Sequence, residues 1–207
     1  MTVAKRFSLL VGFFALGLVF VAGLGDYQTA RVYNSASFGN DNTVPALIAL
    51  DKVSAGVSQI RIGIYRHIFV GTDANKIAVM DRHLEEAENK VRASLKEYEA
   101  TIADSEDKRY FDNVSALFKE YMAAALPLLT SSRTDKKEEA VNLIATLAEK
   151  GIKLEKAIAE HTEYNVKLGQ KAFADARAIQ SSATTLVVIV SAVTLVLVIG
   201  LSLLGAA

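Results

Sequence analysis

The sequence contains no cysteine, which excludes a disulfide framework and thiol chemistry and fits a protein of the bacterial envelope. It has no charge excess either, because 23 basic and 23 acidic residues balance to a net charge of zero. No basic excess therefore points to nucleic acid as a partner. Proline is scarce, with only Pro45 and Pro127 among 207 residues. Abundant Ala, Leu, Glu and Lys, together with few strand-like alternations, predict an all-α fold.

Charge is also absent from two long apolar stretches near the two ends of the sequence. Phe7–Gly25 reads FSLLVGFFALGLVFVAGLG, and residues 179–207 contain TTLVVIVSAVTLVLVIGLSLLG. Each is long enough to cross a bilayer as a helix, so we predict transmembrane helices at residues 7–25 and 181–207. The alternative for the first is a cleaved signal peptide. Its apolar run is longer than a typical signal core and VAGLGD is a loose cleavage site, so we favour an uncleaved anchor.

Lys5 and Arg6 precede the first apolar stretch and set the expected orientation. The positive-inside rule places residues 1–6 in the cytoplasm, and the second span then returns the chain to that side. Residues 26–180 are therefore expected outside, in the periplasm if the cell has two membranes. The predicted location is the inner (cell) membrane, crossed twice.

Four amphipathic helices are predicted in this outer segment, because apolar residues recur at alternating spacings of three and four. The preceding YNSASFGNDNTV is polar and is expected to be irregular or a looser helix. The expected seam residues are Leu50, Val53, Val57, Ile60, Ile64 and His67 in the first helix; Ile77, Met80, Leu84, Ala87, Val91, Leu95, Tyr98 and Ile102 in the second; Tyr110, Val114, Leu117, Tyr121, Ala125 and Leu128 in the third; and Ala140, Ile144, Leu147, Gly151, Leu154, Ile158, His161, Asn165, Leu168, Ala172, Asp175 and Ile179 in the fourth.

Short turns separate these helices. Gly71 is expected to stop the first helix, with Thr72 or Asp73 as the next N-cap, and ADSEDK is the second break. TSSRTD is the third, with Thr134 or Asp135 as N-cap. Short turns make neighbouring helices antiparallel, so the fold class is an all-α, up-down-up-down four-helix bundle flanked by two transmembrane helices.

The run VPALIALDKVSAGVSQIRIGIYRHIFVGTDANKIAVMDRHLEEAENKVRASLKEYEA resembles the opening of a known class of sensor. A short basic N-terminus, one span, four outer helices and a second span are similar to the sensory half of a methyl-accepting chemotaxis receptor. The resemblance implies signal transduction by a membrane receptor that pairs as a homodimer. Such receptors continue into a cytoplasmic signalling domain, whereas this sequence stops at LSLLGAA. We expect that domain to follow Ala207 in a longer protein or to belong to a partner.

SQIRIGIYRH places Arg61 on the shoulder of an apolar seam, with Tyr65 one turn further along the same face. Counted from the turns, Tyr121 and Thr146 are expected at a similar depth on the third and fourth helices. The planar arginine fork suits a carboxylate, so the predicted ligand is a small organic anion. In the aspartate- and serine-sensing relatives, arginines of the first helix bind the ligand at the interface of two subunits; by position these are Arg61 and then Arg66. The predicted ligand-binding residues are thus Arg61, Tyr65, Arg66, Tyr121 and Thr146.

Each of these residues also has a structural interpretation. If it binds no ligand, Arg61 is expected to pair with an acidic residue of the bundle or of a second subunit, and Asp81 and Glu85 lie at a suitable level. Tyr121 is then expected to be a packed ring with a satisfied hydroxyl. His161 and Asn165 are expected to provide polar packing or dimer register.

No catalytic constellation occurs, so the sequence does not predict an enzyme, and it predicts no cofactor. His67, His83 and His161 are scattered over three helices, so no metal site is predicted either. Two alternatives remain for the function. One is an interaction module that docks a periplasmic partner at its far end, and the other is the sensor half of a histidine kinase.

Overall fold

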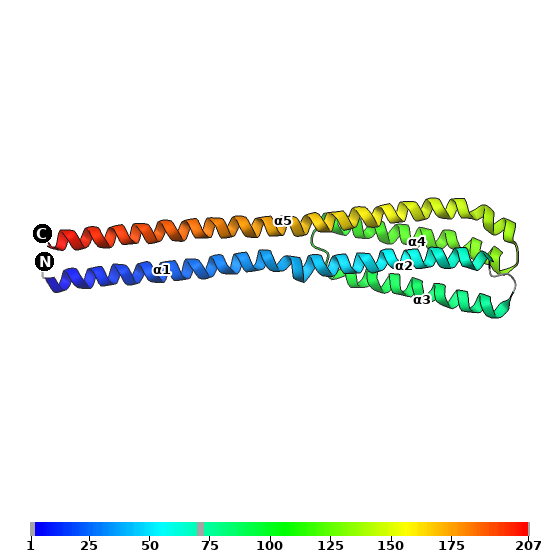
Figure 1. Ribbon diagram of the computed structural model, residues 1–207, viewed down its shortest axis with the longest axis horizontal. Helices are drawn as coiled ribbons and strands as arrows, with labels where there is room; N and C mark the ends of the chain where they lie inside the picture. Colours follow the sequence, from blue (N-terminus) through cyan, green and yellow to red (C-terminus); the bar gives the residue numbers. More distant parts are fainter. Residues whose placement is uncertain (1–2, 70–72, 207) are drawn as a thin grey trace. The chain divides into compact units, whose positions relative to one another are not determined.

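The computed structural model describes residues 3–69 and 73–206, which are helical apart from short turns and contain no strand. Contacts divide the chain into a bundle unit, Asn40–Gly169, and a terminal unit, Met1–Gly39 with Gln170–Ala207. The helices, labelled in Figure 1, are α1 (Val3–Phe38), the π-helix η1 (Gly39–Thr43), α2 (Val44–Phe69), α3 (Ala74–Glu99), α4 (Ser105–Arg133) and α5 (Lys137–Ala206).

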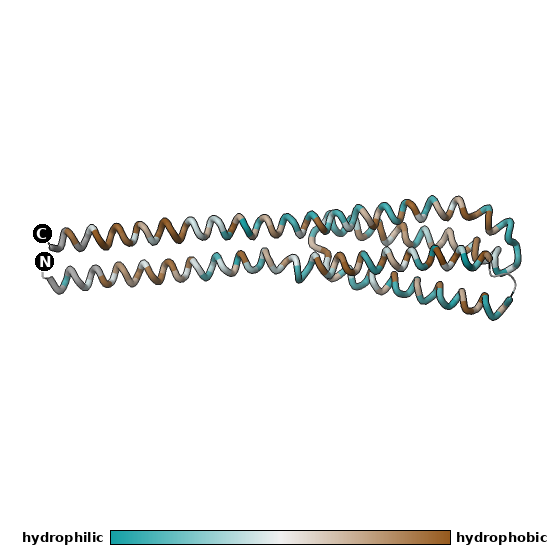
Figure 2. Tube along the Cα trace, in the orientation of Figure 1, coloured by the Kyte–Doolittle hydropathy of each residue, from teal (hydrophilic) through white to brown (hydrophobic). Residues whose placement is uncertain are grey.

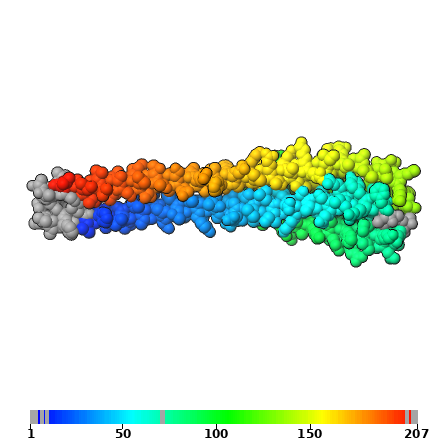
Figure 3. All heavy atoms as spheres, viewed as in Figure 1, coloured from blue at the N-terminus to red at the C-terminus, as the bar shows by residue number. Residues whose placement is uncertain are grey.

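In the bundle unit, α2, α3, α4 and the first part of α5 run alternately up and down (Figure 1). This confirms the predicted four-helix bundle. One apolar cluster joins the four helices, and the predicted seam of α2 lies within it, from Leu50 to Ile64. Side chains fill the space between the ribbons, and α2, α3 and α5 make up much of the face seen in Figure 3.

The predicted seam of α4 is confirmed at Val114, Tyr121, Ala125 and Leu128, which are buried. It is wrong at Tyr110 and Leu117, which are only partly buried, because Phe111 and Phe118 face the core beside them. The buried face of α4 also includes Asp107, which is fully buried. The predicted seam began at Tyr110, so it did not extend back to Asp107 on the same face.

Two glycines let α2 and α3 approach closely. A Cβ on Gly56 would lie 2.4 Å from Val91 Cγ2, and a Cβ on Gly63 would lie 2.7 Å from Leu84 Cδ2. A larger residue at either position would require the Val91 or Leu84 side chain, or the helices themselves, to shift.

The helix ends follow their capping residues. Asp73 is the N-cap of α3, as predicted, and accepts hydrogen bonds from two backbone N–H groups; the predicted Gly71 stop and the Thr72 alternative lie outside the described residues. The predicted N-cap of the fourth helix is wrong. Thr134 caps the C-terminus of α4, Asp135 has a φ of 59°, and α5 begins only at Lys137.

The polar stretch before Pro45 is helical and ends in the π-helix η1, so the looser-helix alternative is confirmed. Pro45 has no N–H to donate, and its ring would clash with a carbonyl of the preceding α-helical turn. The wider turn of η1 lies just before this proline. Thr43 at its end packs against Gly169 of α5, where a Cβ would lie 2.8 Å from the threonine methyl.

The terminal unit holds the two apolar stretches. The continuous helical ranges Val11–Phe69 and Lys137–Gly200 each contain an 18-residue window apolar enough to cross a membrane, and none of either window is buried in the structure. Hydrophobic residues cover α1 and α5 near the chain ends (Figure 2). By length and composition, both helices can span a bilayer.

Candidate functional site

Arg61 projects from α2 and forms an ion pair with Glu155 of α5 through Nη1 and Oε1. The structural alternative of an acidic partner is therefore found, but the partner is Glu155 rather than Asp81 or Glu85. The side chains of Arg61 and Glu155 are 38% and 40% exposed. Pairs this exposed contribute at most about 1 kcal/mol, so the guanidinium can exchange Glu155 for another anion at little cost.

Tyr121 of α4 lies beside this pair, with its ring 1% exposed and packed against Gly151 of α5. Burial raises the pKa of Tyr121 to about 12, and the charges of Tyr65, Arg61 and Glu155 also act on it. Its hydroxyl has no hydrogen-bond partner in the part of the chain that the structure describes. The packed ring is therefore confirmed, but the predicted satisfied hydroxyl is wrong.

Arg61, Tyr65 and Tyr121 thus lie close together and are called the Arg61 cluster below. The other two predicted ligand residues lie elsewhere. Arg66 is exposed and lines a groove between α2 and α3, together with His83 and Lys90. Thr146 is exposed on α5, and no described hydrogen bond links it to the Arg61 cluster.

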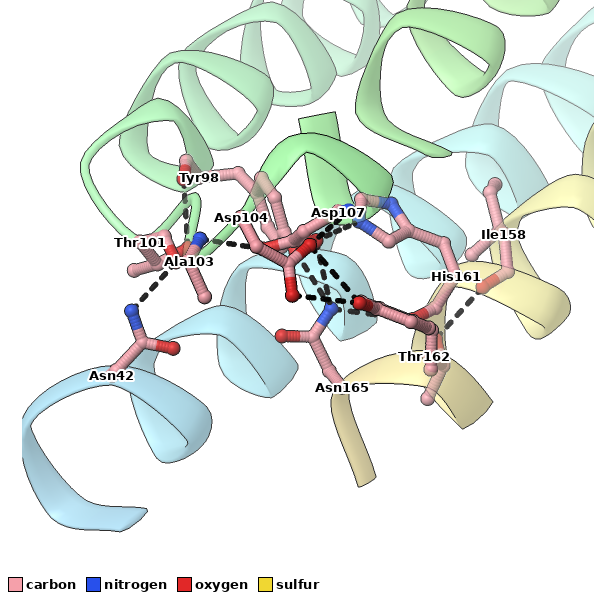
Figure 4. A network of polar contacts seen from close by, with 11 residues as sticks. Asn42, Tyr98, Thr101, Ala103, Asp104, Asp107, Ile158, His161, Thr162 and Asn165 are labelled. Atoms are coloured by element: carbon pink, nitrogen blue, oxygen red, sulfur yellow. Dashed lines mark hydrogen bonds and ion pairs between the residues drawn. The ribbon is translucent and has the colours of Figure 1, made fainter. Parts of the chain in front are cut away.

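A second polar cluster is fully enclosed at the end of the bundle where α3 turns into α4 (Figure 4). Its centre is Asp107, which is 0% exposed. Asp107 Oδ1 accepts hydrogen bonds from the hydroxyl of Tyr98 and from His161 Nε2, the latter at 2.8 Å, and Oδ2 accepts one from the N–H of Ala103 at 2.9 Å. Asn165 Nδ2 donates to Tyr98 Oη at 2.6 Å. We call Tyr98, Asp107, His161 and Asn165 the Asp107 network.

Hydrogen bonding keeps Asp107 ionised. Burial by itself raises the pKa of Asp107, but the bonds from His161, Tyr98 and Ala103 outweigh burial, and the pKa lies below its usual value. Burial and the neighbouring carboxylate raise the pKa of Tyr98. Because the ionised carboxylate only accepts, the ring of His161 must carry its proton on Nε2. Its Nδ1 and the Oδ1 of Asn165 have no partner among the described residues.

The polar packing predicted for His161 and Asn165 is confirmed, because both bond within their own bundle. Sequence reasoning missed Asp107, which it treated as part of a polar break. Asp107 lies four residues before Phe111 and seven before Val114, on the buried face of α4. That spacing would have identified it.

A comparison of the sequence with protein-family models indicates the function of the bundle that carries these clusters. A family model described as a four helix bundle sensory module for signal transduction matches residues 1–179. The chain belongs to this family. A comparison with individual curated proteins gave no match.

Membership confirms the resemblance to the sensory half of methyl-accepting chemotaxis receptors. The sensory module is a signal-transduction sensor, and the family is one of signalling rather than catalytic domains. Together with the two apolar helices, membership points to a membrane location.

Tyr121→Phe separates a ligand role from a packing role in the sensory module. A buried hydroxyl without a partner costs roughly 1–3 kcal/mol of desolvation, so its removal is expected to leave the ligand-free protein equally stable or up to about 2 kcal/mol more stable. Urea unfolding of the full chain in detergent micelles measures this. A clear loss of stability would mean that the hydroxyl is already bonded in the folded protein. Tyr98→Phe is the matched control, because its hydroxyl is bonded and its loss is expected to destabilise.

Proposed function

We propose that this sensory module binds a small organic anion, with a carboxylate group, at the Arg61 cluster. The observation that carries the proposal is the buried, unpartnered hydroxyl of Tyr121 beside an exposed ion pair. Few buried polar groups in folded proteins lack a partner, and a bound ligand is one explanation for an exception.

The chemistry of the cluster suits a carboxylate. Glu155 already presents one carboxylate to Arg61, and an incoming anion would compete with it for the same guanidinium. The planar fork of arginine can then make two parallel hydrogen bonds, and the Tyr121 hydroxyl supplies a further donor. In this proposal Glu155 is a substitute for the ligand in the resting state.

We further propose that two copies pair along α2 and α5, with the ligand at their interface. Exposed apolar residues recur on α2 at heptad-compatible spacing. They are Val44, Ile48, Ile62 and Phe69, which are 47%, 51%, 48% and 76% exposed. Val141, Ile152 and Val166 continue the pattern on α5. Tyr65 lies on the same heptad stripe as Ile62 and Phe69, which supports a ligand close to the second subunit.

The proposed topology has the bundle outside the cell and both apolar helices in the inner membrane. Lys5 and Arg6 before the first apolar stretch support this orientation. The ligand would bias α5 between two positions by the difference between its affinities for them. The signalling domain that reads the shift would follow Ala207 or belong to a partner.

A thermal-shift screen of the full chain in micelles against small mono- and dicarboxylic acids and amino acids tests the proposal. A ligand at 100 times its Kd is expected to stabilise the protein by about 2.7 kcal/mol. Arg61→Ala is expected to weaken the affinity about 30–100-fold, because it removes the bidentate partner.

Lys52→Ala is the matched control, since Lys52 also lies on α2 and pairs with Glu97 on a neighbouring helix. It is expected to leave the affinity unchanged. A hit that stabilises the Arg61→Ala variant as much as the parent protein would exclude Arg61 from the site. If no acid stabilises the parent protein, the result would favour the alternative function, in which the bundle docks a periplasmic partner.

A further inference from the structure

A third polar cluster lies around the buried His67 near the end of α2, six residues beyond Arg61. His67 is 1% exposed. Its Nδ1 lies 2.9 Å from Ser132 Oγ of α4, and its Nε2 lies 3.2 Å from Asp81 Oδ1 of α3. Arg133 of α4 binds the same carboxylate, with Nη2 2.6 Å from Oδ1 and Nε 3.1 Å from Oδ2. These four residues are the His67 cluster.

The serine determines the proton on Nδ1. Ser132 Oγ lies 2.9 Å from the backbone carbonyl oxygen of His67, an atom that can only accept. The single hydroxyl proton is therefore committed to that carbonyl. Ser132 Oγ then has no proton left to donate to Nδ1 of His67, which lies 2.9 Å away. Oγ must therefore accept a hydrogen bond from Nδ1, which requires a proton on Nδ1.

The aspartate determines the proton on Nε2. The hydrogen bond from Arg133 holds the pKa of Asp81 below its usual value, and the charge of Arg133 adds to the effect. An ionised carboxylate only accepts, so Nε2 must donate to it. All of these hydrogen bonds are made at once only when the ring of His67 carries a proton on each nitrogen. His161 differs, because only its Nε2 has a partner.

We propose that the His67 cluster is a proton-binding site and that the module senses pH on the side that its bundle faces, as a stimulus separate from the anion. The bound proton links α2 to α3 through Asp81 and to α4 through Ser132. The titratable and charged groups that face the ring are Asp81 from α3 and Arg133 from α4. Among the described residues, α5 contributes no hydrogen bond, ion pair or ring contact to His67.

Loss of the proton costs the cluster one hydrogen bond. A neutral imidazole has a single N–H, so Nδ1 faces the lone pairs of Ser132, or Nε2 faces those of Asp81, or the hydroxyl turns to Nδ1 and leaves the backbone carbonyl of His67 without its donor. The hydrogen bonds around His67 are therefore all made at low pH, and one of them is lost as the pH rises. This change can occur at physiological pH because histidine changes charge in that range. On the far acid side, protonation of Asp81 weakens the link to α3. Both links hold only in the window between these two events.

Selective ¹⁵N labelling of histidine in the full chain in micelles tests the assignment by NMR. The sequence has three histidines, and His83→Asn assigns the exposed one. As the pH is raised from 5 to 9, we expect the ring of His67 to change from a form with a proton on both nitrogens to a form with one. Ser132→Ala removes the acceptor of Nδ1 and is expected to weaken proton binding at His67 at least tenfold, which is a shift of one pH unit. Ser115→Ala on the same helix is expected to cause no shift.

A His67 ring that carries a single proton throughout this pH range would overturn the proposal, as would a titration unchanged by Ser132→Ala. Amide hydrogen exchange tests whether the proton on His67 joins α2 to α3 and α4. The exchange rates are corrected for their intrinsic dependence on pH. Protection at the end of α2 is expected to fall about tenfold across the titration of His67 in the parent protein, and to be independent of pH in His67→Gln. Protection that stays constant in the parent protein would mean that the proton does not join the helices. If His67→Gln does not fold, Ser132→Ala provides the test instead. In that variant the decrease in amide protection at the end of α2 must occur at a lower pH than in the parent protein.

Discussion

Asp107→Ala is expected to destabilise the bundle by about 3–5 kcal/mol, because it removes the acceptor at the centre of a buried network. The carboxylate accepts hydrogen bonds from Tyr98, His161 and the N–H of Ala103. Tyr98 and His161 are both 0% exposed, so their donors would remain in the interior without this acceptor. An unsatisfied buried donor costs roughly 1–3 kcal/mol. Urea unfolding of the full chain in micelles, followed by the helical signal, measures the loss.

The matched control is Asp112→Ala on the same helix. Asp112 is 57% exposed and pairs with Lys108 one turn away, so its loss is expected to cost no more than about 0.5 kcal/mol. If the two variants unfold at similar urea concentrations, Asp107 does not hold the network together. Asp107→Ala also removes the hydrogen bond that holds His161 of α5 to the start of α4, so amide protection around His161 is expected to fall more than protection around Leu147.

The spacing of apolar residues predicted the bundle because each helix carries its own evidence of which face is buried. All of the α2 seam from Leu50 to His67 is buried, as the 3-4 pattern indicates. Capping turns do not carry such evidence. The break ADSEDK contains two aspartates, of which Asp104 caps α4, while Asp107, one turn later, lies in the core.

The candidate site was harder to predict because its partners lie on helices that are not consecutive. Counting from the turns placed Thr146 opposite Arg61, whereas the residue found there is Glu155, about two and a half turns further along α5. The contact of Thr43 with Gly169 agrees with the observed register. No turn joins α2 to α5, because α3 and α4 lie between them in the sequence. The register of α2 against α5 therefore depends on three turns, and small errors in the predicted position of each turn add up. The hydroxyl of Tyr121 could not be recognised as unpartnered without that register.

Acid is expected to unfold the bundle partly through Asp107. The pKa of this carboxyl is lower in the folded protein than its usual value of 3.8, so the unfolded chain binds the proton first. The stability that Asp107 contributes is thus complete above about pH 4 and falls as the pH drops, by up to about 1.4 kcal/mol for each pH unit, until the folded-state pKa is passed.

The difference between the parent protein and Asp107→Asn isolates this contribution, because the other acids with lowered pKa values remain in both. Urea unfolding between pH 6 and pH 2, with each protein referred to its own value at pH 6, is expected to give a flatter curve for Asp107→Asn. Glu149→Gln removes an exposed acid that pairs with Lys153, and its curve is expected to follow the parent closely. Parallel curves for the parent protein and Asp107→Asn would mean that Asp107 enters the folded core already protonated, and the hydrogen bonds to its carboxylate would then have to be reassigned.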